Sequence, residues 1–266
     1  MKLKKISIGV ACFLLINCSY AAGEQSAGAL APEHRGKFRL PEIKTVADVD
    51  ALTHLTPEEK AFAKIVLKKV PDSNGWAILG NDPELQVLWH MMEREYIAFN
   101  GFQGVPFSHA NLVSIVTAKH ANSDYIYGLF AALTVRQVKA YKMSSDYDAK
   151  LAMLDSPDST LWSDEERLII KFTRASLENK MTDELFAQAR KAWGEKKLLR
   201  SLAWQSYVQM WSITANTLNM KFYPEMLPPG FAIPPEAVTA IDPVVQKTRK
   251  QLQEFVADKL TTFPGR

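Results

Sequence analysis

The sequence predicts an all-α protein, and three observations support this fold class. Apolar residues recur three and four positions apart through most of the chain, a spacing that places them on one face of a helix. Helix-start signals precede several of these runs, and Gly, Asn or Pro follows them. No convincing run of alternating apolar and polar residues indicates a strand. We therefore expect helices packed around one apolar core.

The first expected helices begin at recognisable caps. A capping box that starts at Thr56, with proline at the first helical position, should open a helix over about 57–69. Asp82 should cap a second helix over about 83–100, because proline follows it and apolar residues continue at helical spacing. A third helix is expected over about 107–120.

The second half of the chain continues the same pattern. A break near Asn122 and Ser123 should separate the third helix from a fourth, which runs past Arg136. Ser163 begins another capping box, and Thr182 caps a shorter helix that ends near Trp193 and Gly194. The capping box should open a helix that starts at 164 and continues beyond 175, and the Thr182 cap one over 182–193. Two further helices are expected over 196–218 and 236–258.

The N-terminus has the three parts of a secretory signal peptide. Lysines near the start precede an apolar run over 6–16, and small residues at Ser19 and Ala21 suit cleavage before Ala22. The run is too short to be a comfortable membrane span. We therefore expect residues 1–21 to be a signal peptide, 22–40 an exposed leader, and 41–266 a single domain that is periplasmic or secreted. The alternatives are a retained anchor, a buried N-terminal strand, and a lipoprotein modified at Cys18.

Charge and cysteine content exclude several function classes. The chain has 32 basic and 29 acidic residues, and removing the three lysines of the signal peptide leaves 29 of each. A neutral mature chain lacks the positive field that nucleic-acid binding usually needs. The two cysteines, Cys12 and Cys18, both lie in the signal region, so the mature chain has no thiol for nucleophilic, redox or metal chemistry.

Common motifs for catalysis and metal binding are absent from the sequence. There is no phosphate loop, no Gly-rich dinucleotide fingerprint, no nucleophile elbow and no H-E-x-x-H motif. His90 and Glu93 are three residues apart on an expected helix, but two ligands are too few for a specific metal site. We expect neither a metal nor a cofactor.

The stretch over 111–130 is the most distinctive part of the chain. It joins an apolar helix, a short break and a second helix that begins Ser-Asp-Tyr-Ile-Tyr at 123–127. This pattern resembles the central motif of the carboxymuconolactone decarboxylase and alkylhydroperoxidase-D-like (AhpD-like) superfamily, whose second helix starts with C-x-x-C-x-x-x-H or S-E-Y-E-W-x-x-H. With the segments over 162–167 and 215–219, the resemblance covers about 80–222. It implies an all-α domain of this type that assembles as a homo-oligomer.

The resemblance implies that the family's catalytic groups are largely lost here. Its first and second cysteines fall on Ser123 and Ile126, its histidine on Phe130, and its helix-borne glutamate on Asn111. A hydroxyl at position 123 cannot shuttle electrons as a thiolate does, so a thiol peroxidase is excluded. With Asp124 and Tyr127, these residues are the inherited pocket positions.

Acid–base chemistry with other residues is still possible in principle. Decarboxylation needs a proton donor and a group that holds the carboxylate or lactone oxygen, and the candidates near the motif are His109, His120, Asp124, Tyr125 and Tyr127. Each also has a structural interpretation. His120 suits a helix C-terminus, Asp124 a first helical turn, and Tyr125 an apolar core face.

Two functions therefore stay open. The first is an exported carboxymuconolactone decarboxylase-like protein that has lost its catalytic groups and either binds an unknown small molecule or has a structural role. The second is a cofactor-free lactone decarboxylase, hydrolase or isomerase that uses His120 and Tyr125. Trp204, Tyr207 and Trp211 lie at helical spacing and suit a core or a subunit interface better than a ligand pocket.

Overall fold

The computed structural model describes residues 38–68, 74–92, 107–143 and 146–227, with single positions at 230, 250 and 254. The chain divides into two compact units, one of residues 24–238 and one of residues 1–23 with 239–266. Every element below belongs to the first unit. The expected signal peptide, nearly all of the leader, and nearly all of the expected helix over 236–258 lie outside the described residues.

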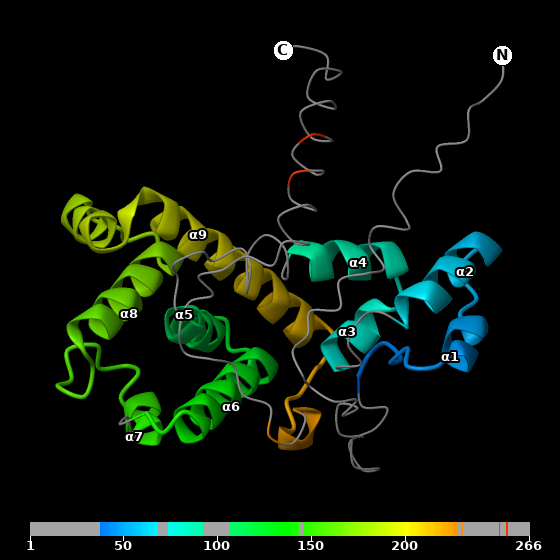
Figure 1. Ribbon diagram of the computed structural model, residues 1–266, viewed down its shortest axis with the longest axis horizontal. Helices are drawn as coiled ribbons and strands as arrows, with labels where there is room; N and C mark the ends of the chain where they lie inside the picture. The colour runs from blue at the N-terminus through cyan, green and yellow to red at the C-terminus, as the bar shows by residue number, and fades with distance from the viewer. Residues whose placement is uncertain are drawn as a thin grey trace. The chain divides into compact units, whose positions relative to one another are not determined.

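Every regular element of the described residues is helical, which confirms the all-α class. The coloured ribbon in Figure 1 follows these helices along the chain. They are α1 (Val46–Ala51), α2 (Pro57–Val66), α3 (Asn74–Leu79), α4 (Pro83–Met91), α5 (Phe107–His120), α6 (Asp124–Ala140), α7 (Tyr147–Ala152), α8 (Asp164–Leu177), α9 (Asp183–Thr217) and a short 3₁₀ helix, η3 (Pro224–Met226). None of the described helices is long and apolar enough to cross a membrane.

The predicted helix starts agree with the structure. At the start of α2, the Thr56 amide donates to a Glu59 carboxylate oxygen at 2.7 Å, and the Glu59 amide donates back to the Thr56 hydroxyl at 3.2 Å. Ser163 and Glu166 make the same reciprocal pair at the start of α8. These bonds satisfy amides that have no partner within the helix.

The predicted break between the third and fourth helices is also confirmed. The α5 helix ends at His120, Asn122 takes a left-handed conformation with φ of 50°, and α6 begins at Asp124. The Ser123 amide donates to the carbonyl of Ala118 at 2.9 Å, which closes the end of α5. Asparagine tolerates the left-handed region better than most residues. This explains why Asn122 marks the break between the two helices in the sequence.

The α9 helix consists of two helical segments, as the sequence predicts. Gly194 joins them in a non-helical conformation, with φ of 72° and ψ of 164°. Trp193, just before this break, is buried, and the second segment begins with charged residues that lead into the buried Leu198. The break therefore lets the two segments follow different directions.

Three short helices were not predicted from the sequence. The helices α1, α3 and α7 have six residues each, too few to show a clear apolar period. The start of α1 did carry a local signal, because Thr45 and Asp48 form a capping box with the Thr45 amide 2.7 Å from the Asp48 carboxylate. A systematic search for Thr-x-x-Asp would have found it.

The core is built around α5. Every side chain from His109 to Ala118 is buried, so this helix has no solvent-facing stripe. It packs against α6, α8 and α9, and Figure 1 shows it nearly end-on between them. A smaller apolar cluster lies beneath α1 and α2 and contains Ile43, Val49, Leu52 and Ala63. The main core therefore contains much of the stretch over 111–130, the most distinctive part of the sequence.

Candidate functional site

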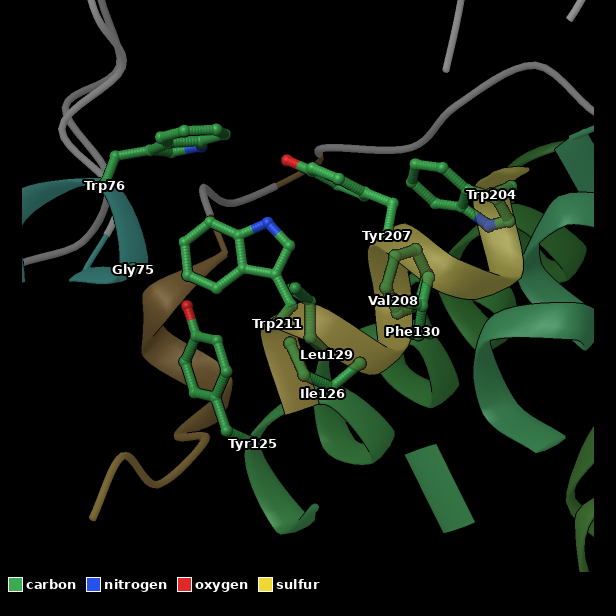
Figure 2. Close-up of a pocket in the computed structure, with 10 residues that line it drawn as sticks. All are labelled: Gly75, Trp76, Tyr125, Ile126, Leu129, Phe130, Trp204, Tyr207, Val208 and Trp211. Carbon is green, nitrogen blue, oxygen red and sulfur yellow. The ribbon is translucent and has the colours of Figure 1, made fainter. Parts of the chain in front are cut away.

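A pocket rich in aromatic side chains lies where α3, α6 and α9 meet (Figure 2). Its volume is about 80 Å³. We call it the aromatic pocket. Its lining residues are Gly75, Trp76, Tyr125, Ile126, Leu129, Phe130, Trp204, Tyr207, Val208 and Trp211, none of which carries a charge.

Helical spacing explains how the lining residues converge. On α9, Trp204, Tyr207 and Trp211 are three and four positions apart, so their rings share one face of the helix. The α6 residues over 125–130 follow the same rule. From α3, Gly75 lets the backbone approach closely, because a Cβ atom there would be 2.9 Å from the Tyr125 hydroxyl oxygen.

The rings of the pocket pack mainly edge to face. The ring centroids of Trp76 and Trp211 are 5.4 Å apart with an interplanar angle of 86°, and those of Phe130 and Trp204 are 6.0 Å apart at 89°. Trp204 and Tyr207 are stacked, with centroids 5.4 Å apart and an angle of 27°. Such arrangements place the positive ring edges against the negative ring faces.

Polar atoms hold two of the rings in place. The indole N–H of Trp204 donates to the Ala110 carbonyl at 3.0 Å and to the Ser114 hydroxyl at 2.8 Å, both on α5. The Tyr207 hydroxyl lies 3.5 Å from the carbonyl of Trp89. The pocket walls are thus anchored to the central helix and to α4.

Four of the residues singled out by the resemblance divide into two pairs. Ile126 and Phe130 both line the aromatic pocket. Asn111 and Ser123 are fully buried and are not part of its lining. Ser123 precedes α6 as its N-cap residue, and its hydroxyl makes no cap hydrogen bond.

Asn111 and Ser123 have an unusual environment for polar groups. Neither side-chain amide atom of Asn111, nor the Ser123 hydroxyl, has a hydrogen-bond partner in the part of the chain that the structure describes. A buried polar group without a partner is destabilising, because folding removes it from water without replacement. These two positions are therefore the least satisfied polar side chains next to the motif.

The remaining inherited positions, Asp124 and Tyr127, make contacts of the kind that stabilise a fold. Asp124 is exposed in the first turn of α6, and its carboxylate pairs with the Lys221 ammonium at 2.7 Å. Tyr127 is half-buried and packs against the main core. Both arrangements agree with the structural interpretation of these residues.

His120 and Tyr125 line different cavities. Tyr125 is buried in the wall of the aromatic pocket, whereas His120 is exposed beside a charged cavity of about 290 Å³. In that cavity the Lys119 ammonium and the Arg174 guanidinium both pair with Asp155 and hold the pKa of its carboxyl below the usual range. The structure therefore does not bring His120 and Tyr125 into one site.

His109 belongs to a buried polar array between α5, α8 and α9. Its Nε2 atom is 3.1 Å from the Ser201 hydroxyl, and its Nδ1 atom is 4.0 Å from a Glu165 carboxylate oxygen. Burial lowers the pKa of His109, so the ring is neutral at neutral pH. The Lys197 ammonium lies 3.6 Å from the same Glu165 oxygen.

The residue types of this array match a nucleophile, a base and an acid, but its placement does not suit catalysis. The Ser201 side chain is only 3% exposed, and it lines neither of the two cavities described above. A nucleophile needs room for a substrate beside it. We therefore interpret the array as a polar connection between three core helices.

The aromatic face of α9 is part of the core of one chain. Trp204, Tyr207 and Trp211 are at most 8% exposed. This burial agrees with the core alternative. The three side chains also line the aromatic pocket, which differs from our expectation that they suit a core or an interface better than a ligand pocket. The expected homo-oligomer itself stays a prediction.

The structure describes only one member of the pair His90 and Glu93, for which we expected no metal. His90 packs edge-on against Trp76 with ring centroids 5.1 Å apart, and Glu93 lies outside the described residues. Within the described ranges, no three His, Cys, Asp or Glu side chains lie close enough to hold a metal ion.

Sequence reasoning missed the contribution of α3 to the pocket. Gly75 and Trp76 carry no motif, and about 50 residues separate them from the α6 part of the wall. It also missed Ser201 and Glu165 as neighbours of His109, because the three come from different helices. No signal within any one segment would have joined them.

Comparison with known proteins gives no relative for this chain. It matches no protein-family model, no curated protein and no solved structure.

Proposed function

We propose that this chain is an exported, carboxymuconolactone decarboxylase-like protein that binds a small molecule in its aromatic pocket and has lost the catalytic groups of that superfamily. The observation that carries the proposal is the pocket itself. Six aromatic side chains from three helices line one cavity, and no charged residue joins them in the part of the wall that the structure describes. An apolar, aromatic lining is typical of small-molecule sites, and a volume of about 80 Å³ restricts the buried part of the ligand to a compact group.

The lining of the pocket supports binding without the superfamily's chemistry. The resemblance assigns its second cysteine and its histidine to Ile126 and Phe130, and these two side chains form part of the apolar wall. Neither can donate, accept or relay a proton. A compact group that fills the pocket would therefore be held by contact and by burial of apolar surface.

The alternative function, an enzyme that uses His120 and Tyr125, has no such observation in its favour. A general acid or base must reach the same substrate as its partner. The two side chains line different cavities and belong to opposite sides of the turn at Asn122.

A thermal-shift screen with compact apolar compounds, both neutral and cationic, tests the proposal. A compound that binds only the folded state raises the melting temperature, and at a hundred times its Kd it adds about 2.7 kcal/mol to the free energy of unfolding. The Gly75→Ala variant should lose this response, because the new methyl group would lie 2.9 Å from the Tyr125 hydroxyl oxygen and 3.4 Å from the Trp211 ring.

The Gly80→Ala variant is a matched control on the same short stretch. Its new methyl group would meet the Ile43 Cβ atom at 2.8 Å, away from the pocket lining, so it should lower stability but keep the response to the compound. The proposal is wrong if no compound raises the melting temperature. It is also wrong if Gly75→Ala responds as the unaltered protein does.

A further inference from the structure

The lining of the aromatic pocket restricts the chemistry of its ligand. Of its ten lining residues, six are aromatic, three are aliphatic and one is glycine. Among the described residues, no lysine, arginine or histidine lines the pocket, so this part of its wall does not repel a cation. No carboxylate lies in the described part of the wall either, where the rings alone would balance a bound cation.

Neighbouring rings that line the pocket face in different directions. Trp76 and Trp211 stand at 86° to each other, and Phe130 and Trp204 at 89°. Figure 2 shows Trp76, Tyr207 and Tyr125 arranged around the ring of Trp211. The face of each ring carries negative potential, which attracts a cation, and a cation loses less by desolvation when its charge is spread over methyl groups.

The size of the pocket suits a compact group. Its volume of about 80 Å³ is roughly half that of an apolar cavity of about 150 Å³ known to hold benzene, so by proportion it has room for about three to four heavy atoms. A trimethylammonium group consists of one nitrogen and three methyl carbons. A full aromatic ring would not fit without a change in the wall.

We propose that the aromatic pocket is a cage for a quaternary ammonium group, and that the ligand of the protein carries such a group at one end. This inference rests on the proposed function, because it names the class of ligand that the same pocket takes. The three tryptophans and the two tyrosines contribute by cation–π attraction, and Ile126, Leu129 and Val208 contact the methyl groups.

A pair of isosteric probes tests the charge directly. Choline and 3,3-dimethyl-1-butanol have the same shape, but only choline carries the positive charge. We expect choline to bind about tenfold or more tightly than the neutral alcohol in calorimetric titrations of the full chain. Because no carboxylate or histidine is among the described residues that line the pocket, the affinity for choline should change less than about twofold between pH 6 and pH 8.

Variants locate the binding site. Trp211→Leu should weaken choline binding about tenfold or more, and Phe130→Leu, at a half-buried position, should weaken it less with a smaller risk to folding. Trp193→Leu is the control. Trp193 is also a buried tryptophan, but it packs against His109 and Phe172 and does not line the pocket. This variant should bind choline as the unaltered protein does.

The outcomes separate the two proposals. If the neutral alcohol binds as tightly as choline and both depend on Trp211, the pocket binds small molecules but the preference for a cation is wrong. If neither probe binds while other compounds do so in a Gly75-dependent way, the cage is again wrong and the binding function stands. If nothing binds at the pocket, both proposals fail.

Discussion

At the scale of single residues, two buried side chains of α5 are exceptions to a well-packed core. Asn111 is completely buried, and its amide has no hydrogen-bond partner among the described residues. His109 is almost completely buried and held neutral. The other buried side chains of α5 are mostly apolar or hydrogen-bonded. We therefore expect Asn111 and His109 each to lower the free energy of unfolding by a measurable amount.

Replacement of Asn111 by leucine should stabilise the protein. Leucine has the same branched arrangement of heavy atoms but no polar group that must be desolvated. We expect Asn111→Leu to raise the free energy of unfolding by about 1 kcal/mol in urea titrations. The control is Ser114→Ala on the same helix, which removes a hydroxyl that donates to the Ala110 carbonyl at 2.8 Å and should lower stability. A loss of stability in Asn111→Leu would indicate that the amide has a bound partner.

The buried His109 should make the protein less stable in mild acid. The pKa of this ring in the folded protein lies below its ordinary value of 6.5, chiefly because burial disfavours the charged form. As pH falls through 6.5 the unfolded chain takes up the proton before the folded chain, so the free energy of unfolding falls, by at most about 1.4 kcal/mol per pH unit for one proton.

Urea titrations between pH 7.5 and pH 5.5 measure this effect. His109→Gln should remove most of the decrease, because glutamine has no proton to gain. Glu165, whose pKa is lowered by His109 and then by Lys197, loses its contribution only at lower pH and so falls outside this window. Equal slopes for the two proteins would show that His109 does not govern the acid response.

At the scale of elements, the two segments of α9 depend on one backbone conformation. Gly194 has φ of 72° and ψ of 164°, a region that residues with a side chain almost never adopt. No atom lies within 4 Å of a Cβ placed there, so a substitution would meet no steric obstacle. Any effect of a substitution must therefore come from the backbone.

Gly194→Ala should lower the free energy of unfolding by about 1 to 3 kcal/mol. Lys196→Ala, an exposed position two residues further along, is the control and should change stability by less than about 0.5 kcal/mol. Thermal and urea unfolding of both variants measure this difference in stability. An unchanged stability in Gly194→Ala, with higher helicity in circular dichroism, would mean that α9 can run through the break as one helix.

At the scale of the whole molecule, the resemblance predicts a homo-oligomer. The face of α9 with Trp204, Tyr207 and Trp211, for which the sequence left a core or a subunit interface open, is buried in one chain, so we do not expect it to be the contact. We expect light scattering at micromolar concentration to give a mass well above the 29.9 kDa of the full chain. A Trp204 variant should not specifically dissociate the oligomer. A single species of monomer mass would contradict the prediction.

The sequence by itself determined most of the local structure. The capping boxes at Thr56 and Ser163, the ends of α5, the turn at Asn122 and the break at Gly194 were all predicted and are all present. Each depends on a few neighbouring residues and on backbone preferences that act within one or two turns. The six-residue helices were missed because so short a segment carries too little periodicity.

Only the tertiary structure decided which side chains meet. Trp76 from α3 joins Tyr125 from α6 and Trp211 from α9 in one pocket, although they are distant in the sequence. It also decided that His120 and Tyr125, five residues apart, line different cavities. The physical reason is that helical spacing specifies the face on which a residue lies, whereas the neighbour of that face depends on how the apolar surfaces of several helices pack together.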